Sequence, residues 1–283
     1  MSQNRSLARN VSFYDATNPD EALGGLVQNG SITETNFLDI LGILLVVDRS
    51  PLLVQERKSG HIVSGTNMPL KIGVYDIHCN TSIQVSDEAW VHRLVSHNTS
   101  REKAKFHHDI SNRYRKCVIS GMVNPEILIQ ANDWTGFEVA YIFPPKHESL
   151  WIQFNYGRWI TDMDDATGSS KINSSQNGFL LRADVHQMFK QYLISVNPDD
   201  GYKIVVFTIE RSGLDSRILD PVCRSPTNPH HVADQLLRWH FCQSVLVNMR
   251  GAGEPIFEHD FPPGTDMVGE ILAGPYAQER FKL

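Results

Sequence analysis

The sequence predicts an α+β fold, in which a small β-rich N-terminal module precedes a mixed domain that ends in a helix and a Gly/Pro-rich tail. Short apolar segments separated by Gly and Pro fill the first third of the chain, as expected of strands joined by turns. Alternating apolar residues flank Asn197-Pro-Asp-Asp-Gly201, which indicates a hairpin, and helical spacing follows from 232 to about 249. The domains we expect are a frayed end at 1–12, the β-rich module at 13–98 and the second domain at 99–283.

The overall charge bears on the kind of partner. At 283 residues and 32.0 kDa, the chain can bury a sizeable core as one large domain or two small ones. Its net charge is −6 and its isoelectric point is near 6.0. A protein that grips duplex DNA usually presents a basic surface, because phosphate neutralisation supplies most of the affinity. The charge therefore argues against DNA as the partner, while leaving room for a local basic patch.

Cysteine spacing and hydropathy indicate the compartment. The four cysteines include no C-x-x-C pair, which disfavours a zinc ribbon and favours reduced thiols. The N-terminal residues lack the apolar run of a signal peptide. The longest apolar run, 40–47, is far short of the roughly 20 residues that a membrane span needs. We therefore expect an intracellular, cytoplasmic protein without a membrane span, or a nuclear one if it acts on DNA.

The elements of the N-terminal module follow from local signals. Thr33 is a candidate N-cap for a helix over 34–45, whose apolar residues recur at helical spacing. Ser86 is a second candidate helix start, ahead of Trp90. The strands we expect are 52–55, 61–64, 71–77 and 82–85.

Residues 99–116 form a basic helix candidate at the start of the second domain. Its charges are explained either by a solvated helix face or by a surface that grips phosphates. A strand is expected at 117–121, and a hairpin over 191–209. The adjacent histidines His107-His108 and His230-His231 point about 100° apart on a helix, which disfavours them as metal pairs.

Three segments resemble the core of a known family. They are Glu138-Val-Ala-Tyr-Ile-Phe-Pro144, Asn173-Ser-Ser-Gln-Asn-Gly-Phe-Leu-Leu181 and Asp184-Val-His-Gln-Met-Phe-Lys190. Their order resembles the ββα-metal core of HNH endonucleases, and in particular the HNH-domain proteins of filamentous fungi. The ending Asn248-Met-Arg-Gly-Ala-Gly-Glu-Pro255 is also similar to that family. The resemblance implies an HNH-like core at 137–190, with Tyr141, Asn177 and His186 at the three motif positions.

Two motif positions depart from the family. The family has histidine as the general base where this chain has Tyr141, and a phenol with a pKa near 10 is a poor base at neutral pH. An acid of the family's helix is replaced by Lys190, whose ammonium would repel a divalent ion. If nuclease activity is kept, the resemblance implies a metal held by His186 and Asn177, and a base from elsewhere, such as His147.

Aromatic residues gather around the expected core and suit either packing or an apolar ligand. The residues we expect to contact a substrate are Trp151, Tyr156, Trp159, Phe179 and Lys190. Tyr141, Asn177 and His186 would be the catalytic hydrogen-bonding groups, and such a site needs no metal or cofactor.

Three functions remain open from the sequence. The first is a cofactor-independent enzyme of fungal secondary metabolism that acts on an apolar small molecule, in a cyclisation or pericyclic, Diels–Alder-like step. The second is a metal-dependent HNH endonuclease acting on DNA. The third is a catalytically inactive HNH-fold binding protein. Substrate identity and oligomeric state are not indicated by the sequence.

Overall fold

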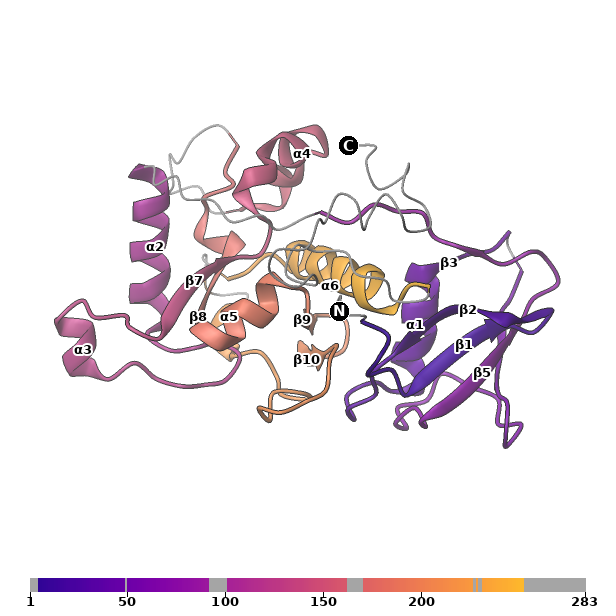
Figure 1. The fold of residues 1–283 in the computed structure, drawn as a ribbon. Coiled ribbons are helices and arrows are strands. Elements are labelled where there is room, and N and C mark those ends of the chain that lie inside the picture. The colour runs from indigo at the N-terminus through magenta and orange to yellow at the C-terminus, as the bar shows by residue number, and fades with distance from the viewer. Residues whose placement is uncertain are drawn as a thin grey trace, which may run out of the picture.

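A four-stranded mixed sheet organises the N-terminal third of the protein (Figure 1). The computed structural model describes residues 5–48, 50–91, 101–161, 170–225, 228 and 231–251. The strands follow the order β2-β1-β5-β4, and β1 pairs in parallel with β5 while the other pairs are antiparallel. The strands of the sheet are β1 (Val11–Asp15), β2 (Asn18–Leu26), β4 (Leu53–Glu56) and β5 (Gly73–His78).

Helix α1 (Glu34–Leu44) packs on this sheet. Thr33 accepts a hydrogen bond from the Asn36 N–H, and the Asn36 side chain accepts one from the Thr33 N–H. This capping box satisfies two backbone donors at the helix start. The ring of Phe37 contacts Phe13 and Tyr75 edge-on, at centroid distances of 5.7 and 5.3 Å. The helix predicted from Thr33 onward is therefore confirmed. A short ribbon of β3 (Leu45–Val46) and β6 (Gln84–Val85) follows it.

The second half of the chain contains the ββα arrangement. Strand β7 (Phe137–Tyr141) pairs antiparallel with β8 (Gly178–Arg182), and helix α5 (Ala183–Lys190) follows β8 directly. The fold is thus α+β, as the sequence predicts. In its described residues, the long connection between the two strands carries η1 (Pro145–His147), α4 (Glu148–Gln153), η2 (Tyr156–Trp159) and η3 (Ser175–Asn177), of which α4 is a short helix and the others are 3-10 turns.

Helix α2 (Arg101–Tyr114) covers one face of the β7–β8 hairpin. Phe106, Ile110 and Tyr114 are its buried residues on this face. A Cβ on Gly178 would lie 2.4 Å from the Phe106 ring, so only glycine allows this close packing. The predicted basic helix is present. It ends at Tyr114, before the end predicted for it. The two cations that follow are paired with acids, Arg115 with Glu126 and Lys116 with Asp220, which supports the solvated-face interpretation for these two residues.

The strand predicted at 117–121 is wrong. The chain makes a tight turn there, in which the Gly121 N–H donates to the Cys117 carbonyl at 2.8 Å. Gly121 has a φ of +78°, the left-handed region that glycine favours. The N–H of Val118 donates to the carbonyl of Leu180, so the turn docks beside β8. Short helix α3 (Glu126–Gln130) follows, with no buried side chain.

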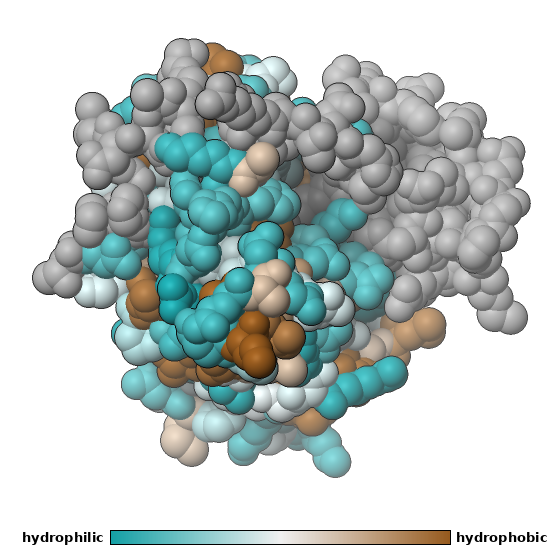
Figure 2. Space-filling view, turned by 90° about the vertical axis from the view of Figure 1, so that its left-hand side faces the viewer, coloured by the Kyte–Doolittle hydropathy of each residue, from teal (hydrophilic) through white to brown (hydrophobic). Residues whose placement is uncertain are grey.

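The face of the molecule that carries α2 and α3 is mostly hydrophilic. Figure 2 shows this side, with a compact group of hydrophobic residues among polar ones. Met122, Val123 and Ile127 are the exposed apolar side chains on and before α3. The basic helix therefore lies on a surface of mixed character.

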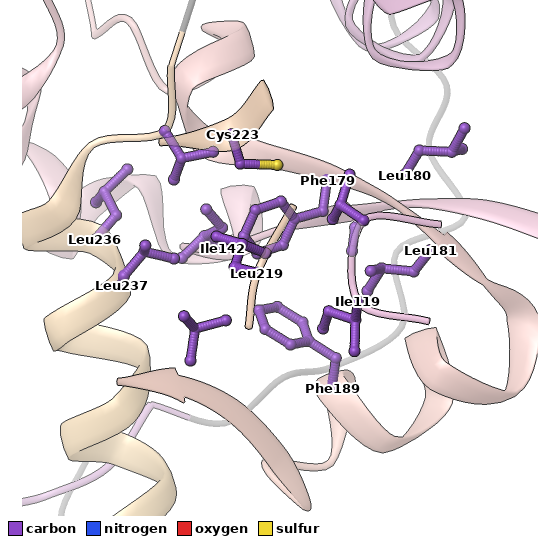
Figure 3. Packing of buried hydrophobic residues seen from close by; sticks show 14 of the residues in the cluster. Ile119, Ile142, Phe179, Leu180, Leu181, Phe189, Leu219, Cys223, Leu236 and Leu237 are labelled. Carbon is purple, nitrogen blue, oxygen red and sulfur yellow. The ribbon is translucent and has the colours of Figure 1, made fainter. Parts of the chain in front are cut away.

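Helix α6 (Asp234–Met249) joins two hydrophobic cores. Its first turns place Leu236 and Leu237 in the core of the ββα half, which Figure 3 shows around Phe179 and Phe189. Its later turns place Val245 and Leu246 in the core beneath the N-terminal sheet. The predicted hairpin is present as β9 (Ile194–Asn197) and β10 (Lys203–Val206), and it also contributes to both cores. A last 3-10 turn, η4 (Pro221–Cys223), precedes α6.

Within the segment 1–12 that we expected to be frayed, the structure describes residues 5–12. Arg9 is tied to the end of α6, because its guanidinium donates to the carbonyls of Gly251, Asn248 and Arg250 at 2.5 to 3.2 Å. Burial lowers the pKa of Arg9 to about 10. Strand β1 already begins at Val11.

Other expectations differ or lie outside the described residues. Strands β1 and β2 were not individually predicted, and residues 86–91 are not helical. The described residues contain no helix long and apolar enough to cross a membrane. The predicted Gly/Pro-rich tail from 252 onward, His230 and residues 92–95 lie outside the described part of the chain.

Candidate functional site

The register of the hairpin assigns each motif side chain to a face. Side chains alternate along a strand, and residues directly opposite in an antiparallel pair share a face. Tyr141 pairs with Gly178 on the side covered by α2. The opposite side is covered by α5, where the rings of Phe179 and Phe189 meet. The positions of β7 and β8 facing α5 are therefore Glu138, Ala140, Phe179 and Leu181.

Tyr141, the position of the family's general base, is held on both its ring and its hydroxyl. The ring stacks on Phe106 with 4.0 Å between centroids and 14° between planes. The hydroxyl donates to Oδ1 of Asn173 at 2.9 Å. Asn173 lies in the chain that returns to β8, so this bond closes the long connection against the end of β7. The arrangement fixes the phenol as a hydrogen-bonding group.

Asn177 is fully buried, and its side-chain amide forms hydrogen bonds with backbone groups. Its Oδ1 accepts from the Phe143 N–H at 2.8 Å, and its Nδ2 donates to the carbonyls of Phe143 and Ile172 at 3.1 and 2.9 Å. These bonds join the two ends of the long connection where strand pairing stops. Because both amide hydrogens are already donated, Asn177 acts as a positioning group for the loop.

His186 lies on α5 and is paired with Glu138 of β7. Nδ1 of His186 contacts Oε2 of Glu138, and the two side chains are 22% and 51% exposed. The pair was missed from the sequence, although the alternation of β7 puts Glu138 on the side where the following helix packs. The structure therefore brings His186 to Glu138 across one face of the hairpin, while Tyr141 stacks on the other.

At this motif the described residues offer few ligands for a divalent metal. Of the four strand positions facing α5, only Glu138 carries a ligating side chain, and it is paired with His186. Lys190 follows His186 by four residues, hence on the same side of the helix, where its charge opposes a cation. Nowhere in the described part of the chain do three or more His, Cys, Asp or Glu side chains gather as a metal-binding group.

The aromatic residues predicted to contact a substrate differ in how deeply they are buried. Trp151 and Phe179 are 1% and 0% exposed and belong to the hydrophobic core. Tyr156 and Trp159 are half-buried and stacked, with 4.6 Å between centroids. Phe154 extends this stack from the Tyr156 side and is 51% exposed. Burial therefore weighs against direct contact by Trp151 and Phe179, while contact by Tyr156 and Trp159 stays a prediction.

Two pockets adjoin this aromatic stack. One has a volume of about 320 Å³ and lies between α4, η2 and residues 170–171. The other, of about 290 Å³, lies between Trp159 and the start of α6. Arg158 lines both. The first pocket is connected to the motif through the chain, because residues 170–171 directly precede Ile172 and Asn173, which bind Asn177 and Tyr141.

Comparison with known families agrees with the ββα arrangement. A family model described as HNH endonuclease matches residues 117–197, which contain β7, β8 and α5. A second model, described as a domain of unknown function (DUF8573), matches residues 8–84, which contain the N-terminal sheet and α1. No curated protein and no solved structure matches the chain. The second half of the chain thus contains an HNH-like domain.

Proposed function

We propose that this protein uses its HNH-like domain as a scaffold for small-molecule chemistry, in place of metal-dependent phosphodiester cleavage. The main support for the proposal is that each motif side chain is already bonded to another group of the protein. Asn177 holds backbone groups, His186 is paired with Glu138, and Tyr141 is bound to Asn173. A metal-dependent nuclease needs these positions for a base and for metal ligands.

The small-molecule part of the proposal is supported by the surface of the long connection between β7 and β8. Trp159 lines a pocket of about 290 Å³, and a second pocket of about 320 Å³ lies beside η2. Both volumes are near the small end of the range for ligand sites, about 300–1,000 Å³. A cyclisation or pericyclic, Diels–Alder-like step suits such a site, because it needs mainly a fixed substrate shape and one polarised carbonyl. The resemblance to fungal HNH-domain proteins extends the proposal to a cytoplasmic step of fungal secondary metabolism.

Tyr141 would be the donor to the carbonyl in that reaction. Its hydroxyl hydrogen is directed at Asn173 Oδ1, so a substrate carbonyl would take the place of the amide oxygen as acceptor. His186 and Glu138 lie on the other face of the hairpin and would position α5, without touching the same carbonyl.

The first test is plasmid cleavage by the purified full chain. The protein is incubated with supercoiled plasmid and Mg²⁺, Mn²⁺, Zn²⁺ or Ni²⁺, and its bound metal is measured on the same sample. We expect no nicking with any ion. Nicking that is lost in His186→Ala and kept in His108→Ala, an exposed histidine of α2, would overturn the proposal.

A metal-dependent endonuclease is the second candidate, and the match to the HNH endonuclease model favours it. It would need a base other than Tyr141, and His147 at the end of η1 is the residue we assign to it. His147→Ala would then abolish nicking. A protein that shifts DNA in a salt-dependent manner without cleaving it would instead support a catalytically inactive binding protein.

A further inference from the structure

The pocket between Trp159 and the start of α6 is built on the loop that carries the motif asparagine. Gln176, which is 1% exposed, directly precedes Asn177 in η3. Its Oε1 accepts from the Thr161 N–H at 2.8 Å, and its Nε2 donates to the Thr161 hydroxyl at 3.0 Å. Its carbonyl accepts from the Ala233 N–H at 3.3 Å. Thr161 and Ala233 both line this pocket of about 290 Å³, so Gln176 holds two of its sides.

His231 also lines this pocket, and a backbone contact determines the tautomer of its ring. Nδ1 of His231 lies 2.7 Å from the carbonyl oxygen of Asn228, and the backbone N–H of His231 donates to the same oxygen at 2.9 Å. Because a carbonyl oxygen only accepts, Nδ1 carries the ring hydrogen, and Nε2 of the neutral imidazole is then an acceptor. No other group of the described residues bonds to this ring, so Nε2 is the ring atom left for a ligand.

The other lining side chains give the pocket no excess of charge. Arg158 and Asp234 are the charged ones, and their charges are opposite. The Asp234 carboxylate accepts from the Tyr202 hydroxyl at 2.9 and 3.1 Å, which fixes it at the start of α6. Trp159 is half-buried, with Tyr156 stacked on its indole and the Arg158 guanidinium 5.5 Å from the ring centre, so it offers a ligand its edge. Such a lining favours a neutral ligand with hydrogen-bonding groups.

We propose that this pocket binds a small neutral molecule through a hydroxyl group that donates its hydrogen to Nε2 of His231. The edge of Trp159 would contact the body of the ligand. The inference rests on the proposed function and narrows its substrate class to molecules with a phenolic, enolic or alcoholic hydroxyl. Binding would reach the motif through Gln176, which contacts two sides of the pocket and is next to Asn177.

The tautomer of His231 is tested on the full chain with ¹⁵N in its histidines. The nitrogen chemical shifts of each imidazole show which ring atom carries hydrogen, and His231→Asn identifies the His231 signals by their loss. We expect the hydrogen on Nδ1. A neutral ring with its hydrogen on Nε2 would contradict the inference, because that nitrogen could not accept.

Two probes of similar shape test the hydroxyl: 2-naphthol, which can donate a hydrogen bond, and 2-methoxynaphthalene, which cannot. Affinities are measured by NMR titration of the uniformly ¹⁵N-labelled chain. We expect 2-naphthol to bind at least about tenfold more tightly, a difference of about 1.4 kcal/mol, because the ether leaves Nε2 without a donor. The indole N–H signal of Trp159, assigned through Trp159→Phe, should shift more on binding than that of Trp151, which lines the other pocket.

Three histidine variants separate the acceptor from the packing of the ring. His231→Asn keeps an N–H near the Nδ1 position for the Asn228 carbonyl but has no atom at Nε2, so the preference for 2-naphthol should be lost. His231→Gln can place its side-chain oxygen near the Nε2 position and should keep part of the preference. His78→Asn, at an exposed histidine of β5, is the matched control and should bind as the wild type does.

Equal affinity for the two probes, or an unchanged preference in His231→Asn, would overturn the inference. So would a larger shift of the Trp151 indole signal than of the Trp159 signal. The plasmid assay separates this inference from the proposed function. A protein that neither nicks plasmid nor prefers 2-naphthol loses this site alone, and one that nicks plasmid loses the proposed function, whichever probe it binds.

Discussion

At the scale of single residues, the HNH-like motif keeps its order but gives its side chains other partners. Asn177 holds the loop, Tyr141 holds Asn173, and His186 holds Glu138. Each partner is a protein group, so substitutions at these positions should first change folding stability. The size of each change depends on whether buried polar groups are left without a partner.

Asn177→Ala should lower the free energy of unfolding by about 3 kcal/mol, because it leaves the buried Phe143 N–H and two carbonyls unpaired. Urea denaturation measures the change. Asn112→Ala, at an exposed asparagine of α2, is the control and should change stability by less than about 0.5 kcal/mol. Equal stabilities of the two variants would contradict the loop-holding role.

Tyr141→Phe keeps the stack on Phe106 and removes the hydrogen bond to Asn173. We therefore expect it to lower the free energy of unfolding by about 1 kcal/mol. Tyr141→Ala removes both and should cost about 3 kcal/mol. Thermal denaturation by circular dichroism compares the two. If Tyr141→Phe were as damaging as Tyr141→Ala, the hydroxyl would matter more than the ring.

At the scale of elements, the start of α1 contains an ionisable group whose effect depends on pH. Glu34 is 6% exposed, and its carboxylate accepts hydrogen bonds from Thr66 and His61. Burial acts to raise the pKa of Glu34, but the hydrogen bonds from Thr66, His61 and the Ser64 backbone outweigh it and hold the pKa below 4.5. A depressed pKa means that the ionised form stabilises the fold.

The contribution of Glu34 should therefore be present above pH 4.5 and disappear as pH falls through its lower folded-state pKa. Glu34→Gln should be clearly less stable than the wild type at pH 6, and the difference should shrink at pH 3. Urea denaturation at both pH values measures this. If the stability difference between Glu34→Gln and the wild type were the same at both pH values, Glu34 would stabilise the fold through the shape of its side chain and not through its charge.

At the scale of the whole molecule, α6 and the hairpin β9–β10 belong to both hydrophobic cores. The N-terminal sheet also touches the end of α6 closely, since a Cβ on Gly24 would lie 2.3 Å from the Met249 carbonyl oxygen and 2.5 Å from the Phe13 ring. The two halves should therefore unfold together rather than as independent domains.

Gly24→Ala tests this contact, and Gly42→Ala is its control. Gly24→Ala should lower stability by more than about 2 kcal/mol, because backbone must move to admit the methyl group. Gly42 lies within α1 with open space around it, so alanine there should raise stability by about 0.5–1 kcal/mol. Calorimetry should show a single transition in both variants, and two separate transitions would contradict a shared core.

The sequence by itself determined the features that depend on neighbouring residues. The capped helix after Thr33, the hairpin around Asn197–Gly201 and helix α6 follow from turn chemistry and periodicity. The order of the ββα motif was predicted from the resemblance to HNH proteins. The turn at Cys117–Gly121 was predicted as a strand, because an apolar run carries the same local pattern in both conformations.

Only the tertiary structure decided which distant residues meet. It pairs β1 with β5, ties Arg9 to the end of α6 and sets His186 against Glu138. It also puts Arg158 and Lys171 in one pocket and buries Phe179, which the sequence assigned to substrate contact. Such contacts form when separate elements pack their apolar faces together. A local sequence pattern does not indicate which polar groups this packing brings within bonding distance.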